Sequence, residues 1–167
     1  MEKEIRLEVS NYLDSIKEED LKAVWLMRNN EEVLKYAESN KPVSWEEYES
    51  VFKYTDYPKL VFRAESQANE IKTTTILGYV EFRNDMIDDD PGVKEWSFFV
   101  APEHRGKGWS HIMLEMAIDY AKEKGYNKIR GIVKRDNDIS QHLHKKLGFK
   151  PIKVRHDTII YILDIVA

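Results

Sequence analysis

The order of apolar and polar residues predicts that the chain opens with one strand and two helices. Apolar and charged residues alternate over Glu4–Val9, with the period of a half-buried strand. A helical period follows, carried by Leu21, Val24, Trp25 and Arg28. A second helix is expected from Ser44, because Ser44 and Glu47 have the spacing of a capping box and apolar residues recur behind them.

Three further strands are predicted in the middle of the chain. Residues 59–66 and 75–82 are rich in apolar and aromatic residues, and the polar turn 67–73 joins them. The acidic turn Asp88–Gly92 comes next, and its proline and glycine mark a change of direction. Residues 93–101 form the third of these strands, which leads directly into a basic loop.

The second half of the chain predicts two helices and three strands. The helix after the basic loop has a broad apolar face that suits packing on a sheet, and Gly125 ends it. A strand over 127–133 and a helix over 137–147 follow, and residues 149–155 and 158–166 close the chain as strands. The predicted order is β-α-α-β-β-β-α-β-α-β-β, which belongs to the α/β class in its α+β form.

Composition narrows the class of protein. At 167 residues the chain is expected to form a single domain over residues 1–167. Its formal net charge of −4 argues against a protein that binds nucleic acid through its charge. The absence of cysteine excludes disulfides, thiolate zinc sites and a cysteine nucleophile, and no other metal site is predicted. Because no secretory signal and no apolar run of membrane-spanning length can be recognised, we expect a cytoplasmic protein without a membrane partner.

A basic, glycine-containing loop joins the strand at 93–101 to the next helix. The residues just before that helix are Arg105, Gly106, Lys107 and Gly108. The first N–H groups of a helix are unpaired and carry partial positive charge, and glycine lets the backbone approach a bulky partner. The loop therefore predicts an anion site, with phosphate as the expected ligand. The P-loop and dinucleotide patterns are both absent, the latter because His111 stands where its last glycine should be.

Two motifs in this half of the chain resemble one family. Arg105, Gly108 and Ser110 have R-x-x-G-x-[GA]-like spacing, with serine in place of the small residue. The segment 136–149, "DNDISQHLHKKLGF", is similar to the signature N-x-x-S-x-x-x-[Tyr]-x-K-x-G-F, with His144 in place of tyrosine. By these motifs and by element order, the chain resembles the GNAT superfamily of acyl-CoA-dependent N-acyltransferases from Arg6 to its last strand. The resemblance implies one domain with a mixed, mostly antiparallel central sheet of about seven strands and helices on both faces.

The same resemblance implies that acetyl-CoA is the acyl donor and that no metal takes part. The pantetheine arm would lie along Phe98, Phe99 and Val100 and pair with their backbone like an added strand. The pyrophosphate would lie at the family's loop, which here comprises Arg105, Gly106, Lys107, Gly108, Trp109, Ser110 and His111. Asn137 and Ser140 would hold the pantetheine end.

His144 is the predicted general acid, because it stands at the position of the family's tyrosine. Asn137, Ser140 and His144 follow the i, i+3, i+7 spacing that places them on one side of a helix. With an ordinary pKa near 6.5, about a quarter of the His144 imidazole would be protonated at neutral pH. The alternative is a histidine at the surface or boundary. The adjoining apolar stripe of Ile139, Leu143 and Leu147 is expected to face the core.

A base must remove a proton from the attacking amine. Some members of the family carry a glutamate on the strand before the asparagine motif, but residues 127–133 contain no acid. Glu95, on the strand before the basic loop, is the first candidate, and Glu81 on the neighbouring strand is the second. The alternative for both is a solvated or salt-bridged carboxylate, with a chain of water molecules carrying the proton.

The acceptor is expected to be a primary amine of a small molecule, such as an amino sugar or a polyamine, or of a peptide. Residues 24–33 and 43–52 resemble the segments that shape the acceptor side in amino-sugar, polyamine and ribosomal-protein acetyltransferases. A second class of function stays open, in which the same fold binds acyl-CoA without catalysis, as a sensor or partner module. Assembly into a homodimer also stays open.

Overall fold

The computed structural model describes residues 4–11, 18–37, 40–55, 57–106 and 108–165. The elements follow the order β1 (Glu4–Asn11), α2 (Glu18–Arg28), α3 (Glu31–Leu34), α4 (Trp45–Tyr54), β2 (Lys59–Ala68), β3 (Ile71–Asn84), β4 (Val93–Val100), η1 (Pro102–His104), α5 (Trp109–Glu123), β5 (Lys128–Lys134), α6 (Asp138–Lys146), β6 (Lys150–Val154) and β7 (Thr158–Asp164). The predicted order is confirmed, with the short helices α3 and η1 as additions. No helix in these ranges is long and apolar enough to cross a membrane.

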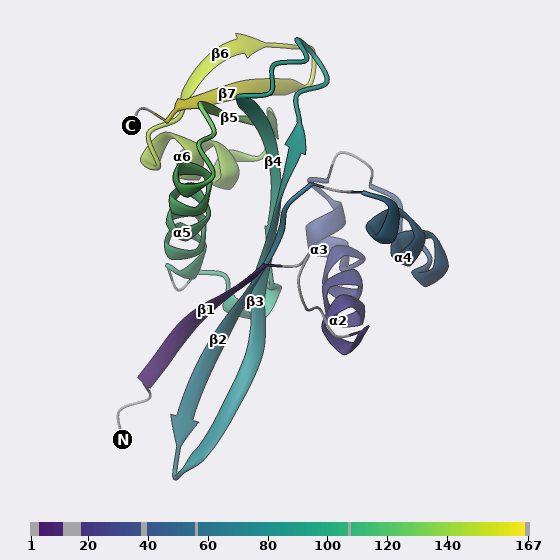
Figure 1. Ribbon diagram of the computed structural model, residues 1–167, viewed down its shortest axis with the longest axis vertical. Coiled ribbons are helices and arrows are strands. Elements are labelled where there is room, and N and C mark those ends of the chain that lie inside the picture. Colours follow the sequence, from purple (N-terminus) through teal and green to yellow (C-terminus); the bar gives the residue numbers. More distant parts are fainter. Residues whose placement is uncertain (1–3, 12–17, 38–39, 56, 107, 166–167) are drawn as a thin grey trace.

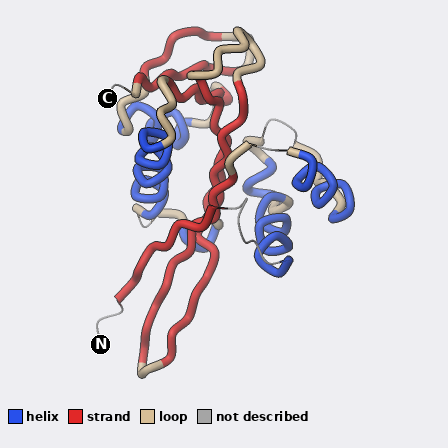
Figure 2. Tube along the Cα trace, in the orientation of Figure 1, coloured by secondary structure: helices blue, strands red, loops and turns tan. Residues whose placement is uncertain are grey.

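The strands form one seven-stranded sheet in the order β1-β2-β3-β4-β5-β7-β6. Every neighbouring pair is antiparallel except β4 and β5, which run parallel. Helices α5 and α6 cover one face of this sheet, and α2, α3 and α4 cover the other (Figures 1 and 2). The expected mixed, mostly antiparallel sheet with helices on both faces is therefore confirmed.

Local signals in the sequence set the ends of two helices. The Ser44 hydroxyl caps α4 by accepting a hydrogen bond from the Glu47 N–H at 3.3 Å, as the capping-box spacing predicts. Gly125 follows α5 with a φ of 76°, the left-handed conformation that glycine adopts without steric cost.

Each face of the sheet has its own apolar core. The larger core lies under α5 and α6, where Met113, Leu114 and Ala117 of α5 are fully buried against Phe82 of β3. The smaller core lies under α2 and α4 and consists of Leu21, Val24, Val61 and Tyr79, with further aromatic residues packed against it. Burying these side chains is the main favourable contribution to folding. The two faces are therefore separate environments.

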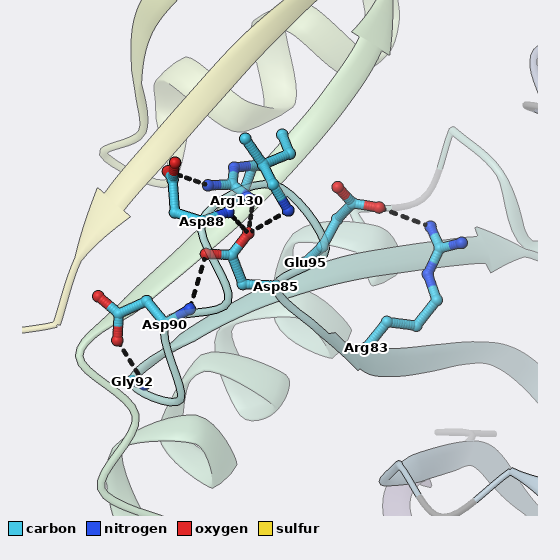
Figure 3. A network of polar contacts seen from close by, with 8 residues as sticks. Arg83, Asp85, Asp88, Asp90, Gly92, Glu95 and Arg130 are labelled. Carbon is cyan, nitrogen blue, oxygen red and sulfur yellow. Dashed lines mark hydrogen bonds and ion pairs between the residues drawn. The ribbon is translucent and has the colours of Figure 1, made fainter.

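A buried ion pair connects the β3–β4 loop to β5. Arg130 Nη1 donates a hydrogen bond to Asp85 Oδ1 at 2.6 Å, and both side chains are buried (Figure 3). The Asp85 carboxylate also accepts hydrogen bonds from the N–H groups of Ile87, Asp88 and Asp90. The hydrogen bond from Arg130 is the main reason that the pKa of Asp85 lies well below its usual range. One carboxylate thus organises the loop and ties it to the neighbouring strand.

Replacing this carboxylate by an amide should destabilise the protein far more than the same change at an exposed neighbour. In Asp85→Asn, the buried Arg130 guanidinium loses its charged partner and one loop N–H faces an amide nitrogen. Asp88→Asn is the matched control, because the exposed Asp88 carboxylate lies 3.9 Å from the same arginine. Urea unfolding at pH 7 should show a several-fold larger loss for Asp85→Asn. Equal losses would mean that the buried pair does not connect these elements energetically.

Candidate functional site

Strands β4 and β5 pair for three residues and then diverge. Within the described chain, the pairing joins Val93–Glu95 to Lys128–Arg130. Beyond it, β4 continues to Val100 beside β3, and β5 continues to Lys134 beside β7. The edge of β4 over residues 96–100 is therefore left without β5 as a partner, and its backbone groups can receive an extended ligand. Phe98, Phe99 and Val100 lie on this segment.

The side chains of this segment alternate between the two faces of the sheet. Phe98 and Val100 pack against the core under α5 and α6. Phe99 points to the opposite face and stacks on Tyr79, with ring centroids 5.2 Å apart. The side chains on both faces of β4 are thus held by packing, and this packing fixes the position of the strand's unpaired backbone edge.

The loop after β4 forms an open cradle at the start of α5. Gly106 and Gly108 have φ angles of 77° and 78°, a left-handed conformation that favours glycine, and Gly108 is the N-cap residue of α5. A Cβ atom built on either glycine has nothing within 4 Å. Trp109 and Ser110 form the first turn, whose N–H groups have no partner within the helix. This arrangement fits a phosphate-bearing ligand, as the sequence predicts.

Two side chains of this loop have partners of their own. Arg105 Nη1 lies 3.4 Å from Glu32 Oε2 of α3, and both side chains are largely exposed. His111 Nε2 lies 2.9 Å from Glu115 Oε1, and its buried Nδ1 has no hydrogen-bond partner among the described residues. Lys107 lies outside the described residues. The Arg105 contact is weak enough for an anionic ligand to replace it.

His144 lies beneath the point where β4 and β5 separate. Its ring is buried and packs near Trp96 and Phe98 of β4, with ring centroids 5.6 and 5.7 Å away. The Trp96 indole N–H donates a hydrogen bond to His144 Nε2 at 3.1 Å. His144 Nδ1 lies 2.7 Å from the Ser140 carbonyl oxygen, which fits a neutral ring protonated at Nδ1. Neither the expected titration near pH 6.5 nor the alternative surface position is therefore correct.

Burial lowers the pKa of His144 to about 4, although its contact with the Ser140 carbonyl acts in the opposite direction. At neutral pH the ring is therefore almost entirely uncharged, rather than one-quarter protonated. Gly131 of β5 makes room for it, because a Cβ there would lie 2.5 Å from His144 Nε2. Sequence reasoning missed Trp96 and Gly131, whose roles depend on contacts between residues far apart in the chain.

The rest of α6 differs from the sequence expectation in one respect. Asn137 is its N-cap residue, and its side-chain oxygen accepts a hydrogen bond from the Ser140 N–H at 3.1 Å. Leu143 and Leu147 pack against the large core as expected. The prediction for Ile139 is wrong, because 82% of its surface is exposed. The helix is rotated so that His144 takes the inward position.

The opposite face of the sheet carries two glutamates at the same site. Glu95 Oε2 lies 3.1 Å from Arg83 Nη2, and the two residues are cross-strand neighbours on β4 and β3 (Figure 3). Glu81 lies two residue pairs further along, opposite Ser97 and on the same face, and accepts a hydrogen bond from the Tyr57 hydroxyl. Burial raises the pKa of Glu81. The site thus combines an unpaired strand edge, an anion cradle and two carboxylates.

The family model of the acetyltransferase (GNAT) family matches residues 25–149, which include the diverging strands, the cradle and α6. The chain belongs to this family. The match supports the resemblance drawn from the two sequence motifs. It leaves the acceptor open, because the model describes the family as a whole.

Two of the proteins that this GNAT chain resembles have names that refer to different amines. The L-amino acid N-acyltransferase MnaT of Escherichia coli is 34% identical over 94 residues, which are 56% of this chain and 50% of that protein. The chain thus matches about half the length of this curated relative. A domain from Methanocaldococcus jannaschii has a TM-score of 0.78 at 21% identity, covering 97% of this chain and 100% of that one. The spermidine N-acetyltransferase of Vibrio cholerae, solved with CoA and spermine, has a TM-score of 0.74 at 22% identity, with 95% of both chains covered.

The described part of this GNAT chain contains no group of three or more histidine, cysteine, aspartate or glutamate residues that could hold a metal ion. The groups that surround the diverging strands are instead hydrogen-bond donors, carboxylates and aromatic rings.

The low pKa of His144 should make stability depend on pH. Its pKa is about 4 in the folded protein and 6.5 in an unfolded chain, so the unfolded chain binds more protons between these values. The titration of His144 should therefore lower the free energy of unfolding by roughly 3 kcal/mol as the pH falls from about 6.5 to about 4. His144→Phe should lower stability at pH 7 but remove this part of the pH dependence.

Urea unfolding at several pH values between 4 and 7 measures the effect. His142→Phe is the matched control, because His142 lies exposed on the same helix, and it should keep the wild-type dependence. An unchanged slope in His144→Phe would show that the buried ring does not titrate as derived.

Proposed function

We propose that this protein is an acetyl-CoA-dependent N-acetyltransferase. The observation that carries the proposal is the separation of β4 and β5 directly before the glycine cradle at α5, in a member of the GNAT family. A strand edge that is followed directly by an anion site can hold the two halves of one long ligand. The edge pairs with an extended amide-containing arm, and the anion site binds a pyrophosphate. Acetyl-CoA has both halves and carries the acyl group at the end of the arm.

The residues of the site fit this donor. We place the pantetheine arm along Phe98–Val100 and the pyrophosphate at the N–H groups of residues 106–111. The open space at Gly106 and Gly108 supports this placement, because side chains there would fill the cradle. Arg105 and Lys107 would add positive charge for the phosphates. Asn137 and Ser140 would lie at the end of the arm, although the Asn137 oxygen is already engaged in the cap of α6.

The proposed reaction is a direct attack within a complex of enzyme, donor and acceptor. A neutral amine bonds to the thioester carbonyl carbon, the carbon–sulfur bond breaks, and a carboxylate on the α2–α4 face takes the amine proton. Among the residues that the structure describes, Glu95 and Glu81 are the two candidate carboxylates on this face near the point where β4 and β5 separate.

The structure changes the proposal for the leaving group. As a neutral ring engaged at both nitrogens, His144 has no proton ready for the sulfur at neutral pH. Coenzyme A can leave as a thiolate, because the pKa of a thiol near 8.5 makes it an adequate leaving group. We therefore propose that His144 supports Trp96 and Gly131 at the point of separation, and that protonation of the sulfur follows departure.

The acceptor is proposed to be a primary amine of a small molecule or a peptide. Relatives and structural neighbours named for L-amino acids, ribosomal-protein alanine and spermidine support this range. Amino-sugar nucleotides stay within it on the sequence resemblance of the first two helices. The alternative, an acyl-CoA sensor with the same fold, would bind the donor without turning it over.

The test is release of free thiol from acetyl-CoA with a panel of amines: free L-amino acids, spermidine, an amino-sugar nucleotide and a peptide with an N-terminal alanine. At least one amine should give turnover far above hydrolysis. Gly108→Val should weaken acetyl-CoA binding by at least tenfold, because a branched side chain is strained at positive φ and fills the cradle. Tight binding without turnover of any amine would support the sensor, and no binding at all would overturn both.

A further inference from the structure

We propose that Glu81 on β3, rather than Glu95 on β4, accepts the proton of the attacking amine. The inference rests on the acetyl transfer proposed above and assigns one of its steps. As the nitrogen–carbon bond forms and the carbon–sulfur bond breaks, the amine proton passes to the Glu81 carboxylate and coenzyme A leaves as a thiolate. Four features of the α2–α4 face support this assignment.

The first feature is the position of Glu81 in the sheet. Its cross-strand neighbours are Lys59 on β2 and Ser97 on β4. Ser97 immediately precedes Phe98, where the pantetheine arm is proposed to begin its pairing. Glu81 and Ser97 point to the face that carries α2 and α4, since Tyr79 and Phe99, two residues away on each strand, pack there. The carboxylate thus lies beside the proposed position of the thioester.

The second feature is the tyrosine surroundings of the carboxylate. The hydroxyl of Tyr57, which follows α4, donates a hydrogen bond to Glu81. Tyr48 of α4 lies close enough to Glu81 for the glutamate charge to raise the pKa of the Tyr48 hydroxyl. Burial and the Glu81 carboxylate raise the pKa of Tyr57 to about 12, so that its hydroxyl stays a donor at neutral pH. Burial raises the pKa of Glu81 and brings it closer to the range of an effective base, although the hydrogen bond from Tyr57 acts in the opposite direction.

The third feature is that cations limit this rise. The charged and titratable groups that act on Glu81 are Arg83 on its own strand, Lys59 on β2, Arg28 on α2, Tyr48 on α4 and Tyr57 after α4. The three cations lower the pKa of Glu81 in the order Arg83, Lys59, Arg28, and burial outweighs them. The carboxylate is therefore made more basic than an exposed glutamate while cations still favour its charged form.

Lys59 also holds Tyr57 in place. Its buried ammonium group donates hydrogen bonds to the carbonyl oxygens of Thr55 and Tyr57, at 3.1 and 3.2 Å. The same nitrogen lies 4.1 Å from the centroid of the Tyr57 ring. The donor that faces Glu81 is thus positioned before any acceptor binds, which is what an effective site requires.

The fourth feature is the contrasting position of Glu95. Its carboxylate forms an ion pair with the Arg83 guanidinium, which stabilises the charged form and uses one of its oxygens. Taking up a proton would weaken that pair, whereas Glu81 faces a phenol that donates to it without a charge. Two carboxylates in different environments on one face divide into a structural and a chemical role.

The experiment compares Glu81→Gln with Glu95→Gln in thiol release from acetyl-CoA over a range of pH. The pKa of the fastest amine of the panel is measured separately, and kcat/KM is expressed per concentration of the neutral amine. Expressed in this way, the rise of kcat/KM with pH reports a base of the enzyme and not the acceptor. Carbon-13 signals of the glutamate carboxyl groups, assigned with the two variants, follow the titration of each residue without any turnover.

Glu81→Gln should lower kcat/KM, expressed per concentration of the neutral amine, by roughly a hundred- to ten-thousandfold and abolish its rise with pH. Glu95→Gln should keep that rise and move it to lower pH, because Arg83 then acts more strongly on Glu81. In the NMR titration, Glu81 should bind its proton at a higher pH than an ordinary exposed glutamate does, because burial raises its pKa.

Loss of the pH-dependent rise in Glu95→Gln alone, or a Glu81 carboxyl whose pKa is not raised above the ordinary value of a glutamate, would overturn the assignment while acetyl transfer stands. Absence of turnover with every amine in the wild-type protein would overturn the proposed function itself, and the assignment with it. Circular dichroism of both variants confirms that a loss of rate is not a loss of fold. Tyr57→Phe provides a further check, because removing the donor should shift the rise to higher pH.

Discussion

The parallel contact between β4 and β5 ends after three residue pairs, and the rest of the site depends on where it ends. Glu95 and Arg130 form the last pair. Arg130 is held by the buried carboxylate of Asp85, which also accepts hydrogen bonds from N–H groups of its own loop, so an ion pair fixes the closed end of the opening. Just beyond, Gly131 gives His144 the space to pack under β4. An extended ligand can therefore enter between two strands whose separation is set by packing before it binds.

The two faces of the sheet provide different chemistry on either side of this opening. Under α5 and α6, aromatic rings surround a neutral His144, and the pKa of its imidazole is lowered by burial. Under α2 and α4, two carboxylates lie among arginine, lysine and tyrosine side chains. A donor held at the strand edge would thus meet a dry apolar surface on one side and proton-accepting groups on the other. This division suits attack by an amine from the α2–α4 face.

Much of the fold could be predicted from the sequence because its signals are local. Alternation marks the strands, the pair Ser44 and Glu47 marks the start of α4, and Gly125 marks the end of α5. The glycine loop was found for the same reason, since Gly106 and Gly108 adjoin the helix they precede. The family match agrees with the motifs that carried the resemblance.

The environment of the site residues could not be predicted in the same way. Ile139 is apolar yet exposed, and the polar His144 is buried, because a tryptophan 48 residues away and the Ser140 carbonyl satisfy its nitrogens. The difference between Glu81 and Glu95 likewise depends on cross-strand register and on a loop after α4. Helical spacing gives the side of a helix on which a residue lies, but not what covers that side. Desolvation and pairing then decide the charge of each group.

A crystal structure of the protein with acetyl-CoA tests most directly whether the opening between β4 and β5 receives the acyl donor. We predict that the pyrophosphate lies on the backbone of residues 106–111, that the pantetheine arm pairs with β4 over Phe98–Val100, and that the thioester lies near Ser97. His144 should remain bonded to Trp96 beneath the opening. Acetyl-CoA bound at another surface, with the strand edge and the cradle left free at saturating concentration, would contradict this placement.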